Sequence, residues 1–137
     1  MKHNLFLPLL FLFSCSLPQQ NILFNSQQEV FLFVYKNYHY EKIDGEPLQL
    51  PEVTLETLKG DCGDWAFLAV YYLNQININA KFAICRQSDY EYNYYHALVY
   101  IDGILYEPRG GIDVTDKYEI SFLYSYELAL FLRPILL

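Results

Sequence analysis

Basic side chains are scarce in this sequence, which has 9 Lys and Arg against 16 Asp and Glu and a formal net charge of −7. A protein that binds nucleic acid neutralises phosphates with a basic stripe or patch, and none is present here. We therefore expect no nucleic-acid partner.

Metal-binding patterns are also lacking. The three cysteines include no Cys-x-x-Cys pair, and the three histidines, His3, His39 and His96, form no pair at ligand spacing. We expect no metal site and no cofactor.

The apolar run at the amino terminus, Leu5–Phe13, is too short to span a bilayer. It has nine residues, follows Lys2, and matches the length of a signal-peptide core. The next residues complete Leu12-Phe13-Ser14-Cys15, which resembles a bacterial lipobox, where the cysteine is lipidated and becomes the first mature residue. An ordinary cleavage site that uses Ser14 and Ser16 as its small residues is the alternative.

These features predict an exported protein of the cell envelope, anchored to the membrane by lipid if Cys15 is acylated. We expect a lipoprotein-type signal peptide over residues 1–14, a tether over 15–26 and one domain over 27–137. Removing residues 1–14 takes away Lys2 alone among the charged residues, so the mature chain stays acidic.

What the sequence has in quantity is apolar and aromatic side chains: 53% of residues are apolar, and there are 14 Tyr and 10 Phe. This composition is typical of a globular domain with a real core. Caps, turns and periodicity predict an α+β fold, in which a buried helix that carries a cysteine packs on a small antiparallel sheet. Helices are expected over 27–38, 54–59, from 62 onward and over 125–132, and strands over 82–86, 95–101, 104–107 and 118–122.

Cys62 lies where the buried helix should begin. Asp61 is a good N-cap, which places the thiol in the first turn, where unpaired N–H groups and the helix dipole stabilise an anion. The same N–H groups could hold an oxyanion after attack on a carbonyl, and Gly60 and Gly63 leave the approach open. Asp61 and Asp64 oppose a thiolate, so a base is needed.

His96 is the candidate base, and a hairpin places it. If Asp102 and Gly103 form a two-residue turn, His96 and Glu107 lie on one face of the sheet as diagonal neighbours. A carboxylate there can hold one ring nitrogen and leave the other for Cys62. The other residues expected on that face are Leu98, Tyr100, Leu105 and Arg109. Asp113 is the competing candidate for the acid.

Cys85 lies in a β-prone stretch, Lys81–Arg86, where a small buried thiol is the ordinary expectation. Because an exported protein meets an oxidising environment, a disulfide between Cys62 and Cys85 is the alternative.

The combined pattern over about residues 56–110 resembles the transglutaminase-like branch of the papain-like cysteine peptidases. The motifs that carry the resemblance are Gly60-x-Cys62-x-Asp64-Trp65-Ala66, Asn77–Lys81 before a strand, His96-Ala97-x-Val99 and Glu107-Pro108. The resemblance implies a transglutaminase-like core and a triad in which Cys62 is the nucleophile, His96 the base and Glu107 the orienting acid. Glu107 stands where the family usually has Asp and follows the histidine sooner than in many members.

The resemblance also implies the activity: a cysteine-dependent hydrolase or acyltransferase that acts on peptide or amide bonds of a peptide or protein substrate through a thiolate acyl-enzyme. Two alternatives remain at this point. One is a cell-wall endopeptidase of the NlpC type, and the other is a surface lipoprotein that uses the fold for binding, with the tyrosine-rich stretch 89–95 as its contact surface. No oxyanion donor upstream of Cys62 is identified, and Gln49 is a candidate.

Overall fold

The computed structural model describes residues 22–42, 45–88 and 94–136. The expected signal peptide, Cys15 and most of the tyrosine-rich stretch 89–95 lie outside the described residues. Among the residues described, no helix has the length and apolar character needed to cross a membrane.

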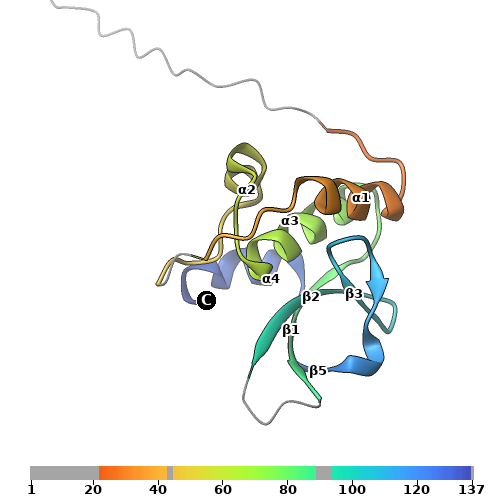
Figure 1. Ribbon diagram of the computed structural model, residues 1–137, viewed down its shortest axis with the longest axis vertical. Coiled ribbons are helices and arrows are strands. Elements are labelled where there is room, and N and C mark those ends of the chain that lie inside the picture. Colours follow the sequence, from red (N-terminus) through yellow and green to blue (C-terminus); the bar gives the residue numbers. More distant parts are fainter. Residues whose placement is uncertain (1–21, 43–44, 89–93, 137) are drawn as a thin grey trace, which may run out of the picture.

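Five antiparallel strands form one sheet in the order β4-β3-β2-β1-β5 (Figure 1). Their bounds are β1 Lys81–Gln87, β2 Tyr95–Ile101, β3 Ile104–Glu107, β4 Ile112–Asp113 and β5 Tyr118–Tyr124. The β-hairpin of β2 and β3 therefore lies inside the sheet, and β5 is an edge strand paired only with β1.

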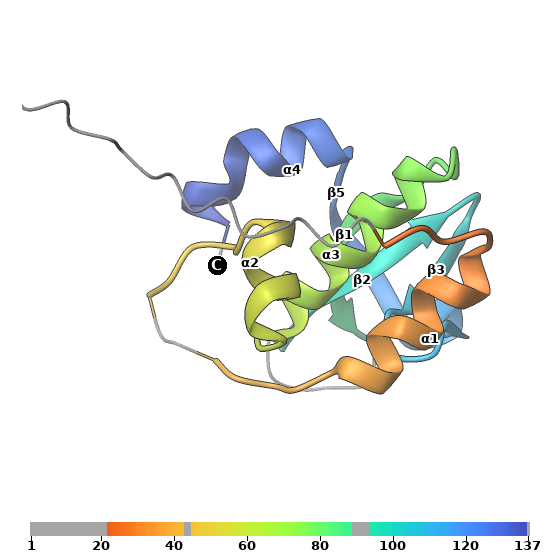
Figure 2. The same ribbon diagram turned by 90° about the horizontal axis from the view of Figure 1, so that it is seen from above.

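The helices lie over one side of this sheet. Their bounds are α1 Gln27–Asn37, α2 Pro51–Thr57, α3 Cys62–Gln75 and α4 Tyr126–Leu132, with short 3₁₀ turns at Thr115–Lys117 and Arg133–Ile135. Figure 2 shows α3 between α1 and α4, above the strands. This arrangement confirms the expected α+β fold, with a cysteine-bearing helix packed on a small antiparallel sheet.

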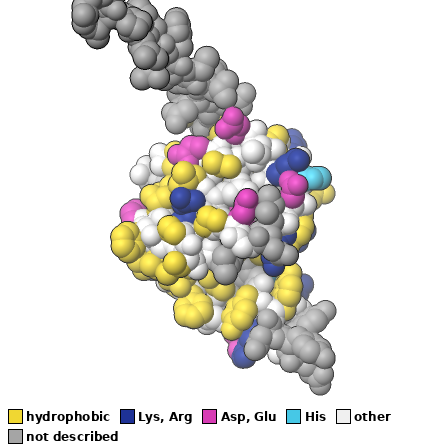
Figure 3. All heavy atoms as spheres, turned by 90° about the vertical axis from the view of Figure 1, so that its left-hand side faces the viewer, with side chains coloured by type: hydrophobic (Ala, Val, Ile, Leu, Met, Phe, Trp, Pro, Cys, Tyr) yellow, Lys and Arg dark blue, Asp and Glu magenta, His cyan; other side chains and the backbone are white. Residues whose placement is uncertain are grey.

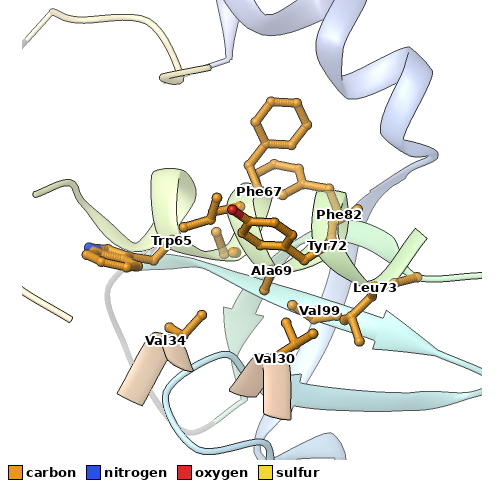
Figure 4. Packing of buried hydrophobic residues seen from close by; sticks show 14 of the residues in the cluster. Val30, Val34, Trp65, Phe67, Ala69, Tyr72, Leu73, Phe82 and Val99 are labelled. Carbon is orange, nitrogen blue, oxygen red and sulfur yellow. The ribbon is translucent and has the colours of Figure 1, made fainter. Parts of the chain in front are cut away.

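The helix α3 is the centre of the core. Nine of its residues are buried, among them Trp65, Phe67 and Leu73, which are fully inaccessible to solvent. Figure 4 shows side chains of α1 on one side of α3, while Phe82 and Val99 reach it from the sheet. A helix that is apolar on all sides must be enclosed by other elements, and this packing fixes the position of its first residue, Cys62.

The two faces of the sheet carry different clusters. Alternate residues of β2, Ala97, Val99 and Ile101, belong to the large cluster around α3. Leu98 faces the other way and joins a smaller cluster made of Ala83, Cys85, Leu98, Leu105 and Val114. His96 has the same parity as Leu98, so its side chain leaves the sheet on the side of the smaller cluster, but at the start of β2 and next to Tyr118.

The predicted hairpin is present. Ile101 pairs with Ile104, and the two turn residues Asp102 and Gly103 have positive φ angles of 48° and 90°, as a type I′ turn requires. The expected pairing does not continue to Arg109, because β3 ends at Glu107 and the chain turns away there.

Other elements differ from expectation. The helix expected over 54–59 spans Pro51–Thr57, because proline has its φ preset for the first helical turn and lacks an N–H that would otherwise need a partner. The left-handed residue that ends it is Leu58 (φ 52°) and not Gly60, and the Leu58 N–H donates to the Thr54 carbonyl.

The short strand β4 was not predicted. Ile22 and Phe24, placed in the tether from sequence, pack against the core.

Exposed apolar side chains concentrate on the last two elements of the chain. Most of β5 faces solvent, as do several large residues in and after α4. The exposed residues there are Ile120, Phe122, Leu123, Leu128, Leu130, Phe131 and Ile135. Figure 3 shows one face on which hydrophobic side chains gather while Lys and Arg are scattered.

Candidate active site

Cys62 is the first residue of α3, as predicted. The Asp61 carboxylate caps the helix, because its Oδ1 accepts hydrogen bonds from the backbone N–H groups of Gly63 (2.8 Å) and Asp64 (3.1 Å). The thiol is therefore held at the amino end of a well-capped helix, where the dipole favours an anion.

Asp64 completes a capping box and ties a second segment to the helix start. Its Oδ2 accepts from the backbone N–H of Asp61 at 3.0 Å, and its Oδ1 accepts from that of Gln49 at 2.7 Å. The preceding loop comes so close that a Cβ on Gly60 would lie 2.6 Å from the Asp64 Cβ. Gly60 is therefore needed for this close approach.

The electrostatic role of Asp64 is milder than the sequence suggests. Burial raises the pKa of Asp64 to about 6. The hydrogen bonds from the backbone N–H groups of Gln49 and Asp61 lower this pKa, while the negative charges of Asp61 and Glu46 raise it. Its charge is directed at two backbone N–H groups, so its main effect is to fix the helix start.

His96 and Glu107 are in direct contact. Their closest atoms, His96 Nε2 and Glu107 Oε2, are 2.8 Å apart, and the two side chains are only 10% and 14% exposed. Tyr118 covers the imidazole, with ring centroids 5.7 Å apart. A carboxylate at this distance fixes both the orientation and the tautomer of the ring.

The other imidazole nitrogen, Nδ1, is buried and has no hydrogen-bond partner among the described residues. The Cys62 thiol nevertheless interacts with the imidazole and raises the pKa of His96. A loose contact of this kind is typical of unliganded sites, where the catalytic hydrogen bond forms with substrate. The structure thus brings Cys62, His96 and Glu107 together.

The charges of the site reinforce one another. Burial lowers the pKa of His96, but hydrogen bonds and charges from Cys62 and Glu107 outweigh it and raise that pKa to about 9. Burial also opposes ionisation of Glu107, yet hydrogen bonds from His96 and Arg109 lower its pKa below the ordinary value. At neutral pH these shifts favour an imidazolium beside the Glu107 carboxylate.

The turn after β3 holds Glu107 in place. The backbone N–H of Gly111 donates to the Glu107 carbonyl at 3.0 Å, and Gly111 has a φ of 67°. A Cβ at Gly111 would clash with the ring of Phe31 from α1. The turn therefore needs glycine both for its conformation and for its contact with the helix layer.

The remaining sequence candidates lie elsewhere or have other partners. Asp113 is exposed and accepts hydrogen bonds from the Thr115 hydroxyl (2.7 Å) and backbone N–H (3.0 Å), so it caps a turn.

Cys85 is fully buried, and burial raises the pKa of its thiol to about 11. Cys62 and Cys85 are both free thiols, so the alternative of a disulfide between them is wrong. The Gln49 side-chain oxygen accepts from the Thr54 hydroxyl at 3.2 Å, a contact that does not involve the amide NH2 by which Gln49 would donate to an oxyanion.

Two contacts of the site go beyond what the sequence pattern predicts. Arg109 donates to Glu107 from two residues further along the chain, and Tyr38, at the end of α1, stacks with Arg109. The spacing of the Glu107–Arg109 pair is a usable signal, since both residues are expected on one face. The contact with Tyr38 joins segments 71 positions apart and has no counterpart in the local pattern.

Comparison with known proteins agrees with this geometry. Residues 17–106, about two thirds of the chain, match the family model of the transglutaminase-like superfamily, so the chain belongs to that superfamily. The match ends one residue before Glu107. No functionally curated protein matches the chain significantly.

The fold also occurs among solved structures. The crystal structure of a cysteine-protease candidate from Cytophaga hutchinsonii superposes with a TM-score of 0.50 and 17% sequence identity. The alignment covers 68% of this chain and 35% of that one, so this chain spans about a third of the length of that protein. At this identity the likeness concerns the fold.

Replacing Asp64 with Asn should remove a pH-dependent loss of stability. Because the pKa of Asp64 is raised to about 6, its carboxyl group favours the folded state while protonated. That contribution is complete below the unfolded value of 3.8 and is lost as pH rises through about 6. Relative to Asp64→Asn, the wild type should lose roughly 3 kcal/mol of unfolding free energy across this range.

Urea denaturation at a series of pH values measures this difference. Asp116→Asn, which neutralises an exposed aspartate, is the matched control and should follow the wild type. If the difference in unfolding free energy between wild type and Asp64→Asn did not change with pH, the raised pKa of Asp64 would be contradicted.

Proposed function

We propose that this protein is a cysteine-dependent hydrolase or acyltransferase that acts on peptide or amide bonds. Cys62 is the nucleophile, His96 the general acid and base, and Glu107 the orienting acid. The observation that carries the proposal is the position of His96: Glu107 holds Nε2 at 2.8 Å, the buried Nδ1 has no hydrogen-bond partner among the described residues, and Cys62 raises the pKa of the imidazole.

The reaction begins with an ion pair. The Cys62 thiolate attacks the carbonyl carbon of the substrate, and the electron pair of the C=O bond moves onto oxygen. The Asp61 side chain already occupies the N–H groups of Gly63 and Asp64, so the backbone N–H of Cys62 itself is the first-turn donor best placed for the oxyanion.

The His96 imidazolium then gives its proton to the leaving amine as the C–N bond breaks, and a thioester remains on Cys62. A water molecule or a second amine loses a proton to neutral His96 and attacks the thioester. The first acceptor completes hydrolysis and the second completes acyl transfer. The thiolate leaves and His96 is protonated again, which restores the ion pair.

Glu107→Gln should keep the fold but lower turnover. The amide cannot stabilise the imidazolium, and it can favour the wrong tautomer of His96. Loss of the orienting acid in a serine triad costs on the order of 10⁴, and a preformed ion pair depends on it less, so we expect a loss of roughly 10- to 1,000-fold. Turnover is measured on a pool of peptide amides by mass spectrometry, with and without an added primary amine.

Asp113→Asn is the matched control, because it makes the same chemical change at an acid that binds Thr115. It should retain turnover, while Cys62→Ala should abolish it. Melting temperatures separate lost chemistry from lost folding. Turnover that survives in Cys62→Ala, or that is lost only in Asp113→Asn with the fold intact, would contradict the assignment.

We also propose that the mature protein is exported and tethered to the membrane through a lipidated Cys15. Support comes from the lipobox-like Leu12–Cys15 after a signal-like apolar run. Because Ile22 and Phe24 pack on the core, residues 16–21 are the spacer between lipid and domain.

Intact-mass analysis of protein from a bacterial host should show loss of residues 1–14 together with added lipid mass. Cys15→Ala should remove the lipid mass and release the protein from the membrane fraction. A wild-type product that is soluble and begins at Leu17 would replace this proposal with plain secretion.

A further inference from the structure

Arg109 contacts the acid of the candidate triad on the side away from His96. Its Nε donates to Glu107 Oε1 at 3.1 Å, while Glu107 Oε2 binds His96 Nε2 at 2.8 Å. Each oxygen of the carboxylate therefore has its own nitrogen partner. A carboxylate held at both oxygens has a fixed plane, which a single hydrogen bond does not give.

The guanidinium of Arg109 is itself anchored. It lies over the Tyr38 ring, 4.8 Å from its centroid, and Tyr38 packs on Trp65 with centroids 5.5 Å apart. Trp65 lies three residues after Cys62 on α3 and donates its indole N–H to the His39 carbonyl at 3.2 Å. These contacts connect α3, which carries Cys62, to Glu107 through Tyr38 and Arg109.

We propose that Arg109 is a positioning residue of this site, which holds the Glu107 carboxylate in the plane that His96 requires and balances the negative charge of the acid beside Cys62. This inference rests on the proposed function.

The need for such a residue follows from the choice of acid. Glutamate has one more rotatable bond than aspartate, so more conformational freedom must be removed to hold its carboxylate at the imidazole. Arg109 supplies a second fixed contact from the same turn. Because its guanidinium is planar and stacks on Tyr38, Arg109 can do this with a geometry that a lysine ammonium lacks.

Burial makes this ion pair different from a surface one. The Glu107 side chain is 14% exposed and that of Arg109 is 46% exposed. The chain also contains Arg86–Glu119, a pair with a similar distance of 3.0 Å in which both partners are exposed, at 48% and 62%. Exposed pairs of this kind contribute little, so Arg86 is a matched control for Arg109.

The charged and titratable groups that interact with the site come from four directions. Cys62 and Asp61 belong to the start of α3, His96 to β2, Tyr38 and Tyr40 to the segment after α1, and Tyr118 to β5. The tyrosines have raised pKa values, mainly because burial disfavours their anions, and are neutral at physiological pH. Arg109 is a permanent cation that interacts with both Glu107 and Cys62.

The test measures how pH controls alkylation of Cys62. Wild type, Arg109→Gln, Arg109→Lys and Arg86→Gln are treated with iodoacetamide from about pH 4 to 10.5, so that the range includes the ionisation of Cys62 and that of His96, whose pKa is about 9. Peptide mass spectrometry separates Cys62 from Cys15 and Cys85. Turnover of peptide amides and melting temperatures are measured on the same samples.

Arg109→Gln should raise the alkylation midpoint by about half a unit to one unit, because a cation is removed from beside the thiolate. Its turnover should fall roughly 10- to 100-fold, because Glu107 Oε1 loses the hydrogen bond from the guanidinium and keeps only the long one, 3.5 Å, from the backbone N–H of residue 109. Arg109→Lys keeps the positive charge but lacks the planar guanidinium. Its alkylation midpoint should therefore stay near that of wild type, while its turnover should lie between those of wild type and Arg109→Gln. Arg86→Gln should match wild type in both.

An Arg109→Gln midpoint and turnover equal to those of wild type, or an equal shift in Arg86→Gln, would overturn the role of Arg109. Failure of the proposed function has a different signature, because it is visible in wild type alone: Cys62 would then alkylate with the pH profile of an ordinary thiol, near 8.5. A shift confined to Arg109→Gln, with an unchanged melting temperature, would support the inference.

Discussion

The hydrogen bond of 2.8 Å between His96 Nε2 and Glu107 Oε2 is the interaction on which the chemistry of this site depends. It decides which imidazole nitrogen is engaged and which is left to face Cys62. Together with Cys62, it also raises the pKa of His96 against the burial that lowers it. In the proposed mechanism, Cys62 would without this bond have a helix dipole but no oriented base.

The rest of the fold can be understood as support for that contact. The type I′ turn at Asp102–Gly103 fixes the register of β2 and β3, and register decides whether Glu107 faces His96 or the opposite side. The fully enclosed helix α3 brings its amino end to the same place. There the capping box of Asp61 and Asp64 satisfies the backbone N–H groups of Asp61, Gly63 and Asp64 and so fixes the start of the helix.

The local parts of this arrangement were predictable from sequence, and the non-local parts were not. The hairpin, the Asp61 cap and the position of Cys62 depend on residues within a few positions of one another, so turn and capping chemistry identify them. Asp64 was expected to oppose the thiolate, because only its charge was visible. Its hydrogen bond to Gln49, fifteen residues earlier, requires the folded chain. The same reason hid the Tyr38–Arg109 contact and the clash that makes Gly111 necessary beside Phe31.

The most direct test of the account is the pKa of His96, measured by NMR of ¹⁵N-labelled histidine in the mature protein, with His39→Gln to assign the signals. The account predicts an imidazole that stays protonated well above neutral pH, with a pKa of about 9. In Cys62→Ala the pKa should fall by about one unit or more, because the thiolate partner is lost. A His96 that titrates at or below the ordinary value of 6.5, or a pKa that is the same with and without Cys62, would contradict the ion pair.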